Sequence, residues 1–409
     1  MQAHSFSGAP ARTVGIGIVG LGTAGRSLLP AIAAHPHVRL AAVADSLHEA
    51  REGVATRFAA ASCADIEALV ARADVDAVYI ATPTELHAQH VEIAATAGKA
   101  VLVEKPMAID CSEALRMINV AERNGVVLLV GHSHSYDTPY QAMRDIVAGG
   151  SLGSVRMMHN IYYTDWMYRP RRTEELDSVL GGGVTNRQGA HQFDILRLIG
   201  GGLVKTVRAT TFDWDPRRPG TGAHTAFLTF VDGTVATAVY NGYGGFLSSE
   251  ICCDIAELGD TQRSVPGASR DAFYAQSGDD EMTAKRQRAA TEPSGRAAHQ
   301  PFFGWTIVSC EGGDIRQSPD GLYVYSERGR IEVPLTFELG TRDRVLIEFY
   351  ESIVGDRAPL HDGRWGLANL EVAIAAQTSS RTSSEITLEY QIAVRDDART
   401  LRGPGGELR

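Results

Sequence analysis

The first third of the chain alternates short apolar runs with longer stretches of helical periodicity. Short apolar runs are typical of parallel strands buried on both faces. They predict strands at 14–20, 38–44, 75–81, 100–103 and 126–130. The stretches between them predict helices from about residue 26 and over 48–60, 65–73, 85–97 and 110–124. This alternation predicts an α/β fold, with an N-terminal Rossmann domain built on a doubly wound parallel sheet.

The pattern changes after residue 131, where segments of strand composition follow one another with fewer helices between them. Strands are expected at 154–163, 203–213, 224–231, 234–241, 305–310 and 322–333. Helices are expected at 138–149, 187–199, 341–354 and 364–379. This order predicts a C-terminal α+β domain with an open, mostly antiparallel sheet and helices on one face.

These patterns divide the chain into a Rossmann domain over 14–131 and an α+β domain over 132–390. Within the second domain, the polar stretch at 260–300 is expected to be a partly disordered insertion or flap. We expect a flexible arm over 1–13 and a C-terminal tail over 391–409.

Composition narrows the class of protein. The 409 residues carry a net charge of -10, which argues against a non-specific nucleic-acid surface. No stretch approaches the roughly 20 apolar residues that a membrane span needs, and the N-terminus lacks the apolar core of a signal peptide. The five cysteines are odd in number and lack metal-ligand spacing. We therefore expect reduced thiols, no metal, no nucleic-acid or membrane partner, and a cytoplasmic protein.

A glycine-rich turn follows the first predicted strand. In the run Gly20–Gly25, the glycines allow a tight turn and let the backbone approach a pyrophosphate at a helix N-terminus. The predicted cofactor contacts in this turn are Gly20, Gly22, Thr23, Ala24 and Gly25. Asp45 ends the next strand, where an acid bonds the adenosine ribose and repels a 2′-phosphate. This favours NAD, and Ser46 beside Asp45 is a further predicted cofactor contact. Ser46, His48 and Arg51 leave NADP open, and a purely structural turn that binds no dinucleotide is the alternative interpretation.

A lysine follows another buried strand. Val101–Val103 leads into Glu104-Lys105-Pro106, and the carboxyl end of a parallel strand lies at the ligand crevice. Partial desolvation there lowers the pKa of an ammonium group and suits it to proton transfer. From spacing alone, a surface lysine is nearly as good an interpretation.

Several motifs together resemble the Gfo/Idh/MocA oxidoreductase family. They are GIVGLGTAG, Asp45, ATPTELHAQH at 81–90, EKP at 104–106, and the segments 181–201 and 357–388. The resemblance covers nearly the whole chain except 260–300. It implies that Lys105 moves the proton of the reacting hydroxyl and that the open sheet forms a homodimer or homotetramer. The further cofactor contacts that it implies are Ala81, Thr82, Pro83, Glu85, His87, Glu104, Lys105 and Pro106.

The second domain departs from the family's pattern at one position. The family has Asp-x-Gly-x-His-x-x-Asp, and this chain has Arg187 where the first Asp would stand, followed by His191 and Asp194. The resemblance implies that His191 is a second acid/base or a hydroxyl ligand. Asp194 would contact substrate or buttress its helix. Because many sugar and cyclitol members grip a polyol with the replaced Asp, Arg187 implies a different substrate.

Arginines and aromatic residues gather between 162 and 172. A guanidinium fork binds carboxylates bidentately, and aromatic rings beside it form a flat apolar wall. The residues that we expect to bind substrate here are Trp166, Tyr168, Arg169 and Arg171. They would suit a small cyclic molecule with acid groups. A solvated basic loop over core aromatics is the alternative. The cluster is too short, and the protein too acidic, for single-stranded nucleic acid.

A narrower similarity adds a substrate. GHSHSYDTPY at 131–140, TDWMYRPRR at 164–172 and CEGGDIRQSPDGLYVY at 310–325 are similar to the phthalate 4,5-cis-dihydrodiol dehydrogenase branch of the family. This implies oxidation of a carboxylated cis-dihydrodiol to a catechol with NAD. His132 and His134 would lie beside the cleft, with His134 near the substrate. Dehydrogenation of a sugar, glycoside or cyclitol, a redox-neutral enzyme with tightly bound NAD, and a non-catalytic dinucleotide sensor stay open.

Overall fold

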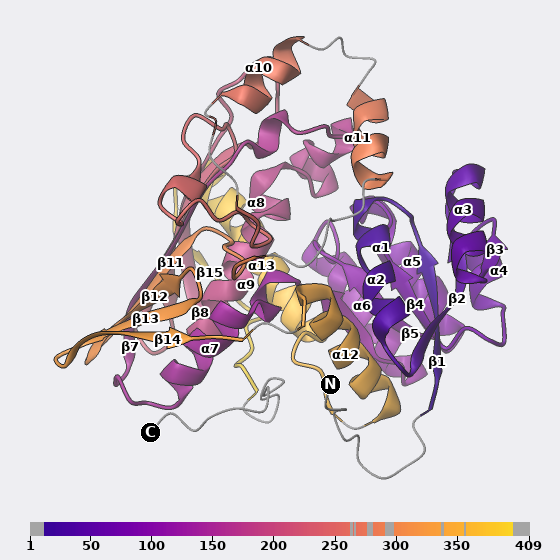
Figure 1. Ribbon diagram of the computed structural model, residues 1–409, viewed down its shortest axis with the longest axis horizontal. Coiled ribbons are helices and arrows are strands. Elements are labelled where there is room, and N and C mark those ends of the chain that lie inside the picture. The colour runs from indigo at the N-terminus through magenta and orange to yellow at the C-terminus, as the bar shows by residue number, and fades with distance from the viewer. Residues whose placement is uncertain are drawn as a thin grey trace.

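The computed structural model describes residues 12–261, 265, 267–275, 281–290, 298–336, 339–355 and 357–395. Figure 1 shows the N-terminal half on the right, in indigo and purple, and a second sheet on the left. No helix in these ranges is long and apolar enough to cross a membrane. The five cysteines are free thiols.

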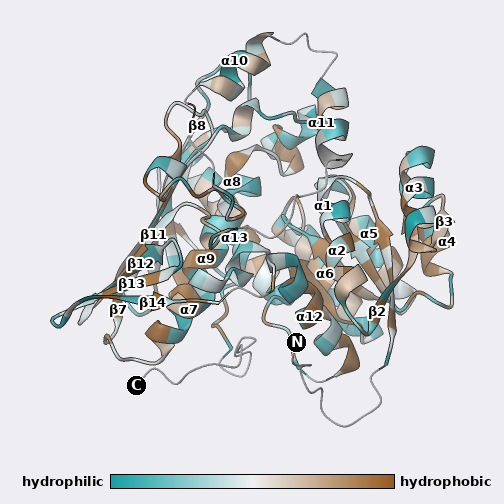
Figure 2. Ribbon diagram, viewed as in Figure 1, coloured by the Kyte–Doolittle hydropathy of each residue, from teal (hydrophilic) through white to brown (hydrophobic). Residues whose placement is uncertain are grey.

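The N-terminal half is a six-stranded parallel sheet in the order β3-β2-β1-β4-β5-β6, which confirms the predicted Rossmann fold. Its strands are β1 (Val14–Val19), β2 (Val38–Ala44), β3 (Ala61–Cys63), β4 (Ala77–Ile80), β5 (Ala100–Glu104) and β6 (Leu128–Gly131). Its helices are α1 (Thr23–Ser27), α2 (Leu29–Ala34), α3 (His48–Phe58), α4 (Ile66–Val70), α5 (His87–Thr96) and α6 (Cys111–Asn124). Figure 2 contrasts the apolar β2 with the hydrophilic α3 beside it.

The second half is a nine-stranded sheet in the order β14-β13-β12-β11-β7-β10-β9-β8-β15, antiparallel at every pair except β7 with β10. Its strands are β7 (Val155–Tyr163), β8 (Val204–Phe212), β9 (Ala223–Phe230), β10 (Val235–Asn241), β11 (Trp305–Cys310), β12 (Gly313–Ser318), β13 (Gly321–Ser326), β14 (Gly329–Pro334) and β15 (Ile386–Thr387). The predicted mostly antiparallel sheet is therefore confirmed. The boundary between 131 and 132 stays a prediction.

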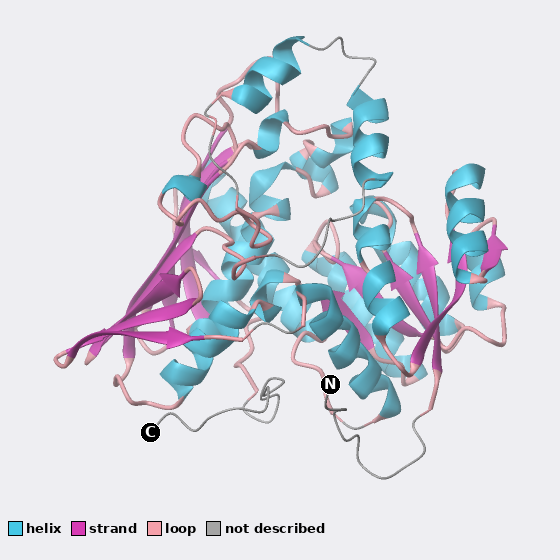
Figure 3. Cartoon of the chain, in the orientation of Figure 1, coloured by secondary structure: helices cyan, strands magenta, loops and turns pink. Residues whose placement is uncertain are grey.

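Helices cover one face of this sheet. They are α7 (Thr138–Ala148), α8 (Gly183–Arg187), α9 (Gly189–Ile199) and α13 (Gly363–Thr382), while α12 (Thr341–Val354) packs on α2 of the other half. Figure 3 shows these helices on the side of the sheet that faces the N-terminal half. On β9, Ala226 and Leu228 are buried while Phe227 between them is exposed. Because strand side chains alternate, Phe227 lies on the face that these helices leave open.

Some predicted elements were wrong in extent. The run 322–333 is a hairpin of β13 and β14 that turns at Glu327 and Arg328, before Gly329 with its φ of +97°. β3, β12 and β15 were not predicted. β3 and β15 are too short to show a pattern, and β12 has a single buried apolar side chain, that of Ile315. The helix at 65–73 covers only α4, and the one at 187–199 breaks at Gln188 between α8 and α9.

The insertion at 260–300 contains two helices, α10 (Ala268–Ala275) and α11 (Glu281–Ala290). The rest of the predicted flap lies partly outside the described residues, as do residues 1–11 of the predicted arm and 396–409 of the predicted tail. α11 contacts α1, so the insertion reaches the N-terminal half (Figure 1). Residues 391–395 pack against the second half, where the Val394 backbone N–H donates to the Gly201 carbonyl oxygen at 2.9 Å.

Candidate active site

A cavity of about 1800 Å³ is lined by residues of both halves and of the insertion helices α10 and α11. Most of the predicted site residues line it, from both halves of the chain. They are Gly20, Gly22, Thr23, Ala24, Asp45, Ala81, Thr82, Pro83, His87, Glu104, Lys105, His134, Trp166, Tyr168, Arg169, Arg171, Arg187 and His191. The predicted residues outside this lining are Gly25, Ser46, Glu85, Pro106 and Asp194.

The glycine turn is packed tightly on one side and open on the other. A Cβ on Gly20, which has a φ of +92°, would lie 2.7 Å from the Ala81 carbonyl oxygen, and one on Gly25 would lie 1.9 Å from that of Gly20. A Cβ on Gly22 would meet nothing within 4 Å, and Gly22 faces the cavity. The turn therefore fits the close approach of a pyrophosphate.

Asp45 holds this turn in place from the end of β2. Its Oδ2 accepts a hydrogen bond from the Leu21 backbone N–H at 2.6 Å, and its Oδ1 accepts one from Leu47 at 2.8 Å. The carboxylate also lines the cavity, where it can accept from ribose hydroxyls. Arg51 donates to the Asp45 carbonyl oxygen at 3.0 Å, and Ser46 is exposed outside the cavity. This arrangement fits NAD.

Glu104 ends β5 and Lys105 follows it directly. The Lys105 Nζ donates to the Arg187 carbonyl oxygen at 3.0 Å, and burial, followed by the Arg187 cation, lowers its pKa to about 7. Glu104 accepts from the Tyr79 hydroxyl at 2.6 Å and from Arg342 at 2.7 Å. Burial raises the pKa of Glu104, but Arg342 and Lys105 outweigh it and lower that pKa to about 2. Lys105 thus titrates near neutrality beside an ionised carboxylate.

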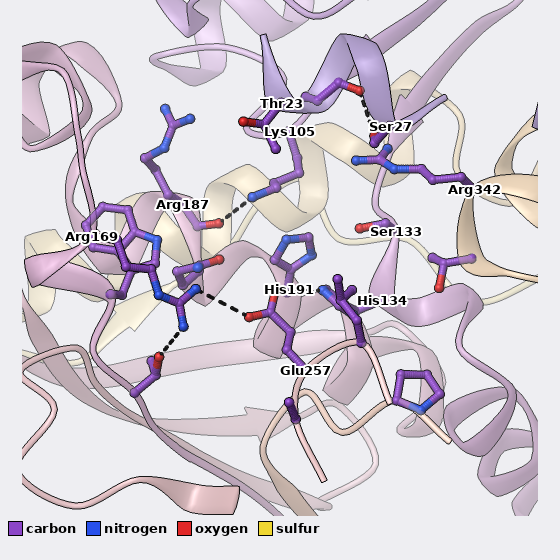
Figure 4. A pocket seen from close by; sticks show the side chains of 18 of the residues that line it. Thr23, Ser27, Lys105, Ser133, His134, Arg169, Arg187, His191, Glu257 and Arg342 are labelled. Carbon is purple, nitrogen blue, oxygen red and sulfur yellow. Dashed lines mark hydrogen bonds and ion pairs between the residues drawn. The ribbon is translucent and has the colours of Figure 1, made fainter. Parts of the chain in front are cut away.

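Two histidines face each other in the cavity, with ring centroids 4.6 Å apart. Burial, then the charges of Lys105 and His134, holds the pKa of His191 well below its usual range, so His191 is neutral. Among the described residues, the buried His191 Nδ1 has no hydrogen-bond partner. Burial lowers the pKa of His134, but Asp137, 2.8 Å from its Nδ1, raises it to about 9. Figure 4 shows both rings in the cavity.

Three predicted residues brace the site from outside the lining. Asp194 is fully buried and accepts from the Trp365 Nε1 at 2.6 Å, so it buttresses α9 and does not reach the cavity as a substrate ligand would. Glu85 pairs with Arg172 at 3.6 Å. The Pro106 carbonyl oxygen lies 3.0 Å from the Nδ1 of His87, which is buried.

The arginines and aromatics after β7 line the cavity and do not form a solvated loop. Trp166 and Tyr168 are only 2% and 4% exposed, and the Arg171 guanidinium lies over the Trp166 ring at 4.1 Å. Arg169 donates to Asp165 at 2.7 Å. Arg187 makes longer contacts, at 3.5 Å to Glu175 and 3.5 Å to the Thr84 hydroxyl.

Several cavity residues lie outside every motif of the sequence. Arg342 pairs with Glu104 across 238 residues of chain. Lys285 of α11 pairs with Glu175, and Glu257 stands in a segment without a motif. Each depends on a long-range contact that periodicity and local motifs do not report.

Family comparisons agree with this geometry. Residues 14–132 match the Gfo/Idh/MocA oxidoreductase family with an NAD-binding Rossmann fold, and residues 140–247 match a C-terminal domain of that family. The chain belongs to the Gfo/Idh/MocA oxidoreductase family. It is an NAD(P)-dependent dehydrogenase that holds NAD in its N-terminal half and acts on a small molecule.

Individual relatives differ in their named substrates. A Comamonas testosteroni protein, 1-carboxy-3-chloro-3,4-dihydroxycyclohexa-1,5-diene dehydrogenase, is 38% identical over 88% of this chain and 93% of its own length. A solved structure from Bordetella bronchiseptica RB50, described as a candidate dehydrogenase, is 37% identical with a TM-score of 0.87, over 92% of this chain and 100% of its own. Inositol 2-dehydrogenase of Rhizobium meliloti (strain 1021) is 33% identical over 48% of this chain and 58% of its own length.

Proposed function

We propose that this enzyme oxidises a ring hydroxyl of a carboxylated cis-dihydrodiol of the phthalate type, giving the catechol. The observation that carries this proposal is a proton acceptor, Lys105, in the same cavity as the loosely paired cation Arg187. The named substrate of the Comamonas relative, a carboxylated dihydroxycyclohexadiene, supports it.

The residues divide the reaction between them. The turn Gly20–Gly25 and Asp45 would hold the dinucleotide, which accepts a hydride when bound. Lys105 in its neutral form takes the hydroxyl proton, so one hydride and one proton leave the carbinol. The Arg187 carbonyl oxygen orients the lysine Nζ, and the free Nδ1 of His191 can hydrogen-bond the ring hydroxyl. The resulting dienone tautomerises to an aromatic ring, which makes the net reaction favourable.

Arg187 is the proposed ligand of the substrate carboxylate. Its contacts to Glu175 and Thr84 are both 3.5 Å long, so its guanidinium fork keeps capacity for a closer, charge-assisted partner. Trp166 lines the same cavity, with the Arg171 guanidinium over its ring. A cyclitol or sugar is the second candidate substrate, because Asp165 and Glu257 also line the cavity and carboxylates accept bonds from polyol hydroxyls.

The test is NADH formation, followed by absorbance, on a carboxylated cyclohexadiene cis-diol, its methyl ester and myo-inositol. We expect the free acid to be the best substrate. At a pH high enough to keep Lys105 neutral in both enzymes, Arg187→Ala should raise its KM by about 10- to 100-fold, the loss of one charge-assisted contact, and leave the KM of the ester unchanged. The control is Arg156→Ala, an exposed arginine that pairs with Glu311 outside the cavity. Equal or better use of the ester or inositol would refute a carboxylated substrate.

We also propose that copies of the chain assemble through the open face of the nine-stranded sheet. Exposed apolar side chains on and beside its strands support this: Met157, Phe212, Trp214, Phe227, Val231 and Ile331. The occupant that fits is a second copy, because the resemblance to the family implies assembly of like chains through this sheet.

A further inference from the structure

Glu257 projects a carboxylate into the cavity from a segment that carries no motif. Its Oε1 lies 3.4 Å from the His134 Nε2, and its Oε2 accepts from the Tyr162 hydroxyl at 3.2 Å. The Arg169 Nη1 lies 3.9 Å from the same Oε2. Figure 4 shows the Glu257 carboxylate between the His134 and Arg169 side chains, close to His191. Glu257 thus belongs to the same group of side chains as the proposed acid/base residues.

The backbone around Glu257 is fixed on both sides. A β-bridge joins Ile255 to Thr261, and the Ala256 N–H donates to the Asp260 carbonyl oxygen at 2.8 Å. Ile255 also packs in a small buried cluster with Cys252 and Phe302. A carboxylate held this way is positioned before any ligand arrives, which is what recognition of a small molecule requires.

The carboxylate is ionised and keeps spare acceptor capacity. Burial raises the pKa of Glu257, but His134 and Arg169 outweigh it and lower that pKa to about 2. An ionised carboxylate has about four lone-pair sites, and the three contacts above, at 3.2 to 3.9 Å, are long. The side chain is 25% exposed and lines the cavity. A donor from a ligand can therefore reach it.

We propose that Glu257 accepts a hydrogen bond from the second hydroxyl of the substrate, the one that is not oxidised, and so selects vicinal diols. This rests on the proposed function, in which Lys105 deprotonates the neighbouring hydroxyl. A ligand with hydrogen in place of the second hydroxyl would desolvate this anion without giving it a donor. Sites built to bond a hydroxyl reject analogues that lack it for this reason.

The test is calorimetric binding to the NADH-loaded protein, with 3,4-dihydroxybenzoate against 3-hydroxybenzoate and 4-hydroxybenzoate. These rings share the carboxylate and differ in the vicinal hydroxyl. We expect wild-type protein to bind the dihydroxy ligand about 10- to 100-fold more tightly, as a bond to a charged group implies. Glu257→Gln should reduce that ratio at least tenfold and leave NADH affinity unchanged. Glu311→Gln, at an exposed carboxylate outside the cavity, should keep the wild-type ratio.

Equal binding of the three ligands by wild-type protein would overturn this role, and so would a Glu257→Gln variant that weakens all three equally. If Glu257→Gln fails to fold, Glu257→Asp keeps the charge and shortens its reach, and an intermediate ratio is expected. Ligand selection by Glu257 without NADH formation on any carboxylated diol would refute the proposed function alone. NADH formation from the carboxylated diol without ligand selection would refute the Glu257 role alone.

Discussion

The ammonium of Lys105 donates a 3.0 Å hydrogen bond to the backbone carbonyl oxygen of Arg187. This bond joins the end of β5 to the end of α8, so the two halves of the chain meet at the proposed proton acceptor. Because the acceptor is a backbone atom, a substitution at 187 changes the charge beside Lys105 without removing the bond. Arg187, which stands where the resemblance to the family implies an Asp, therefore changes the electrostatics beside the proposed proton acceptor.

The rate of oxidation should depend on pH through Lys105. Its pKa is lowered to about 7, so the neutral amine that accepts a proton predominates above that pH. We expect kcat/KM to rise about tenfold per pH unit below 7 and to level off above it. Lys105→Met should lose about 100- to 10,000-fold in kcat, the usual contribution of a positioned base. A profile that stays flat through pH 7 would contradict this role.

Arg187→Asp should move this pH dependence upward. Arg187 is the second cause, after burial, of the low pKa of Lys105, and an anion in its place favours the protonated amine. We expect the midpoint of the kcat/KM profile to rise by at least about one unit. The methyl ester of the substrate is the appropriate probe, because it separates this effect from carboxylate binding. An unchanged midpoint in Arg187→Asp, with Arg187→Gln as the neutral comparison, would argue against coupling between the two residues.

The N-terminal half of the site could be predicted because its geometry is local. A parallel sheet brings the carboxyl ends of its strands to one edge, so the residues after β1, β2 and β5 must meet. Gly22, Asp45 and Lys105 accordingly line one cavity.

The second half could be predicted only in outline. Glu104 is ionised by Arg342, 238 residues away, and no local pattern reports such a partner. Asp194 matched a family motif, yet its contact with Trp365, from α13, turns it away from the cavity. Motifs therefore indicated candidate residues, while long-range packing decided which of them face the cavity.

Two glycines of the same turn should respond differently to alanine. A Cβ added at Gly22 would meet nothing within 4 Å, and the φ of Gly22 is an ordinary -71°, so the Gly22→Ala variant should keep the wild-type melting temperature. The added methyl group faces the cavity and should weaken NADH binding about tenfold or more by blocking close backbone approach. Gly25→Ala would place a Cβ 1.9 Å from the Gly20 carbonyl oxygen and should destabilise the fold by about 1–3 kcal/mol. Thermal melts and NADH fluorescence titrations of both variants test this, and a common loss of stability would contradict it.

The choice of cofactor should depend on the charge of Asp45. Asp45→Asn keeps an oxygen that can accept from the Leu21 N–H and removes the charge that repels a 2′-phosphate. We expect the preference for NADH over NADPH, measured by fluorescence titration, to fall by about tenfold. Glu52→Gln, at an exposed carboxylate outside the cavity, is the matched control. An unchanged preference in Asp45→Asn would show that discrimination lies elsewhere.

The open face of the nine-stranded sheet should hold copies of the chain together. Phe227 is exposed on β9, and its cross-strand neighbours Arg208 and Thr237 extend the same face onto β8 and β10. Burying a charge in such an interface is unfavourable, so Phe227→Glu should shift the mass measured by light scattering from an oligomer to the 44.0 kDa chain. Leu258→Glu introduces the same charge at another exposed apolar residue, which lies outside the strands of this sheet and lines the cavity, and should leave the mass unchanged. A wild-type protein that already elutes as a single chain would rule out this interface, and an oligomeric Phe227→Glu variant would place it on another surface.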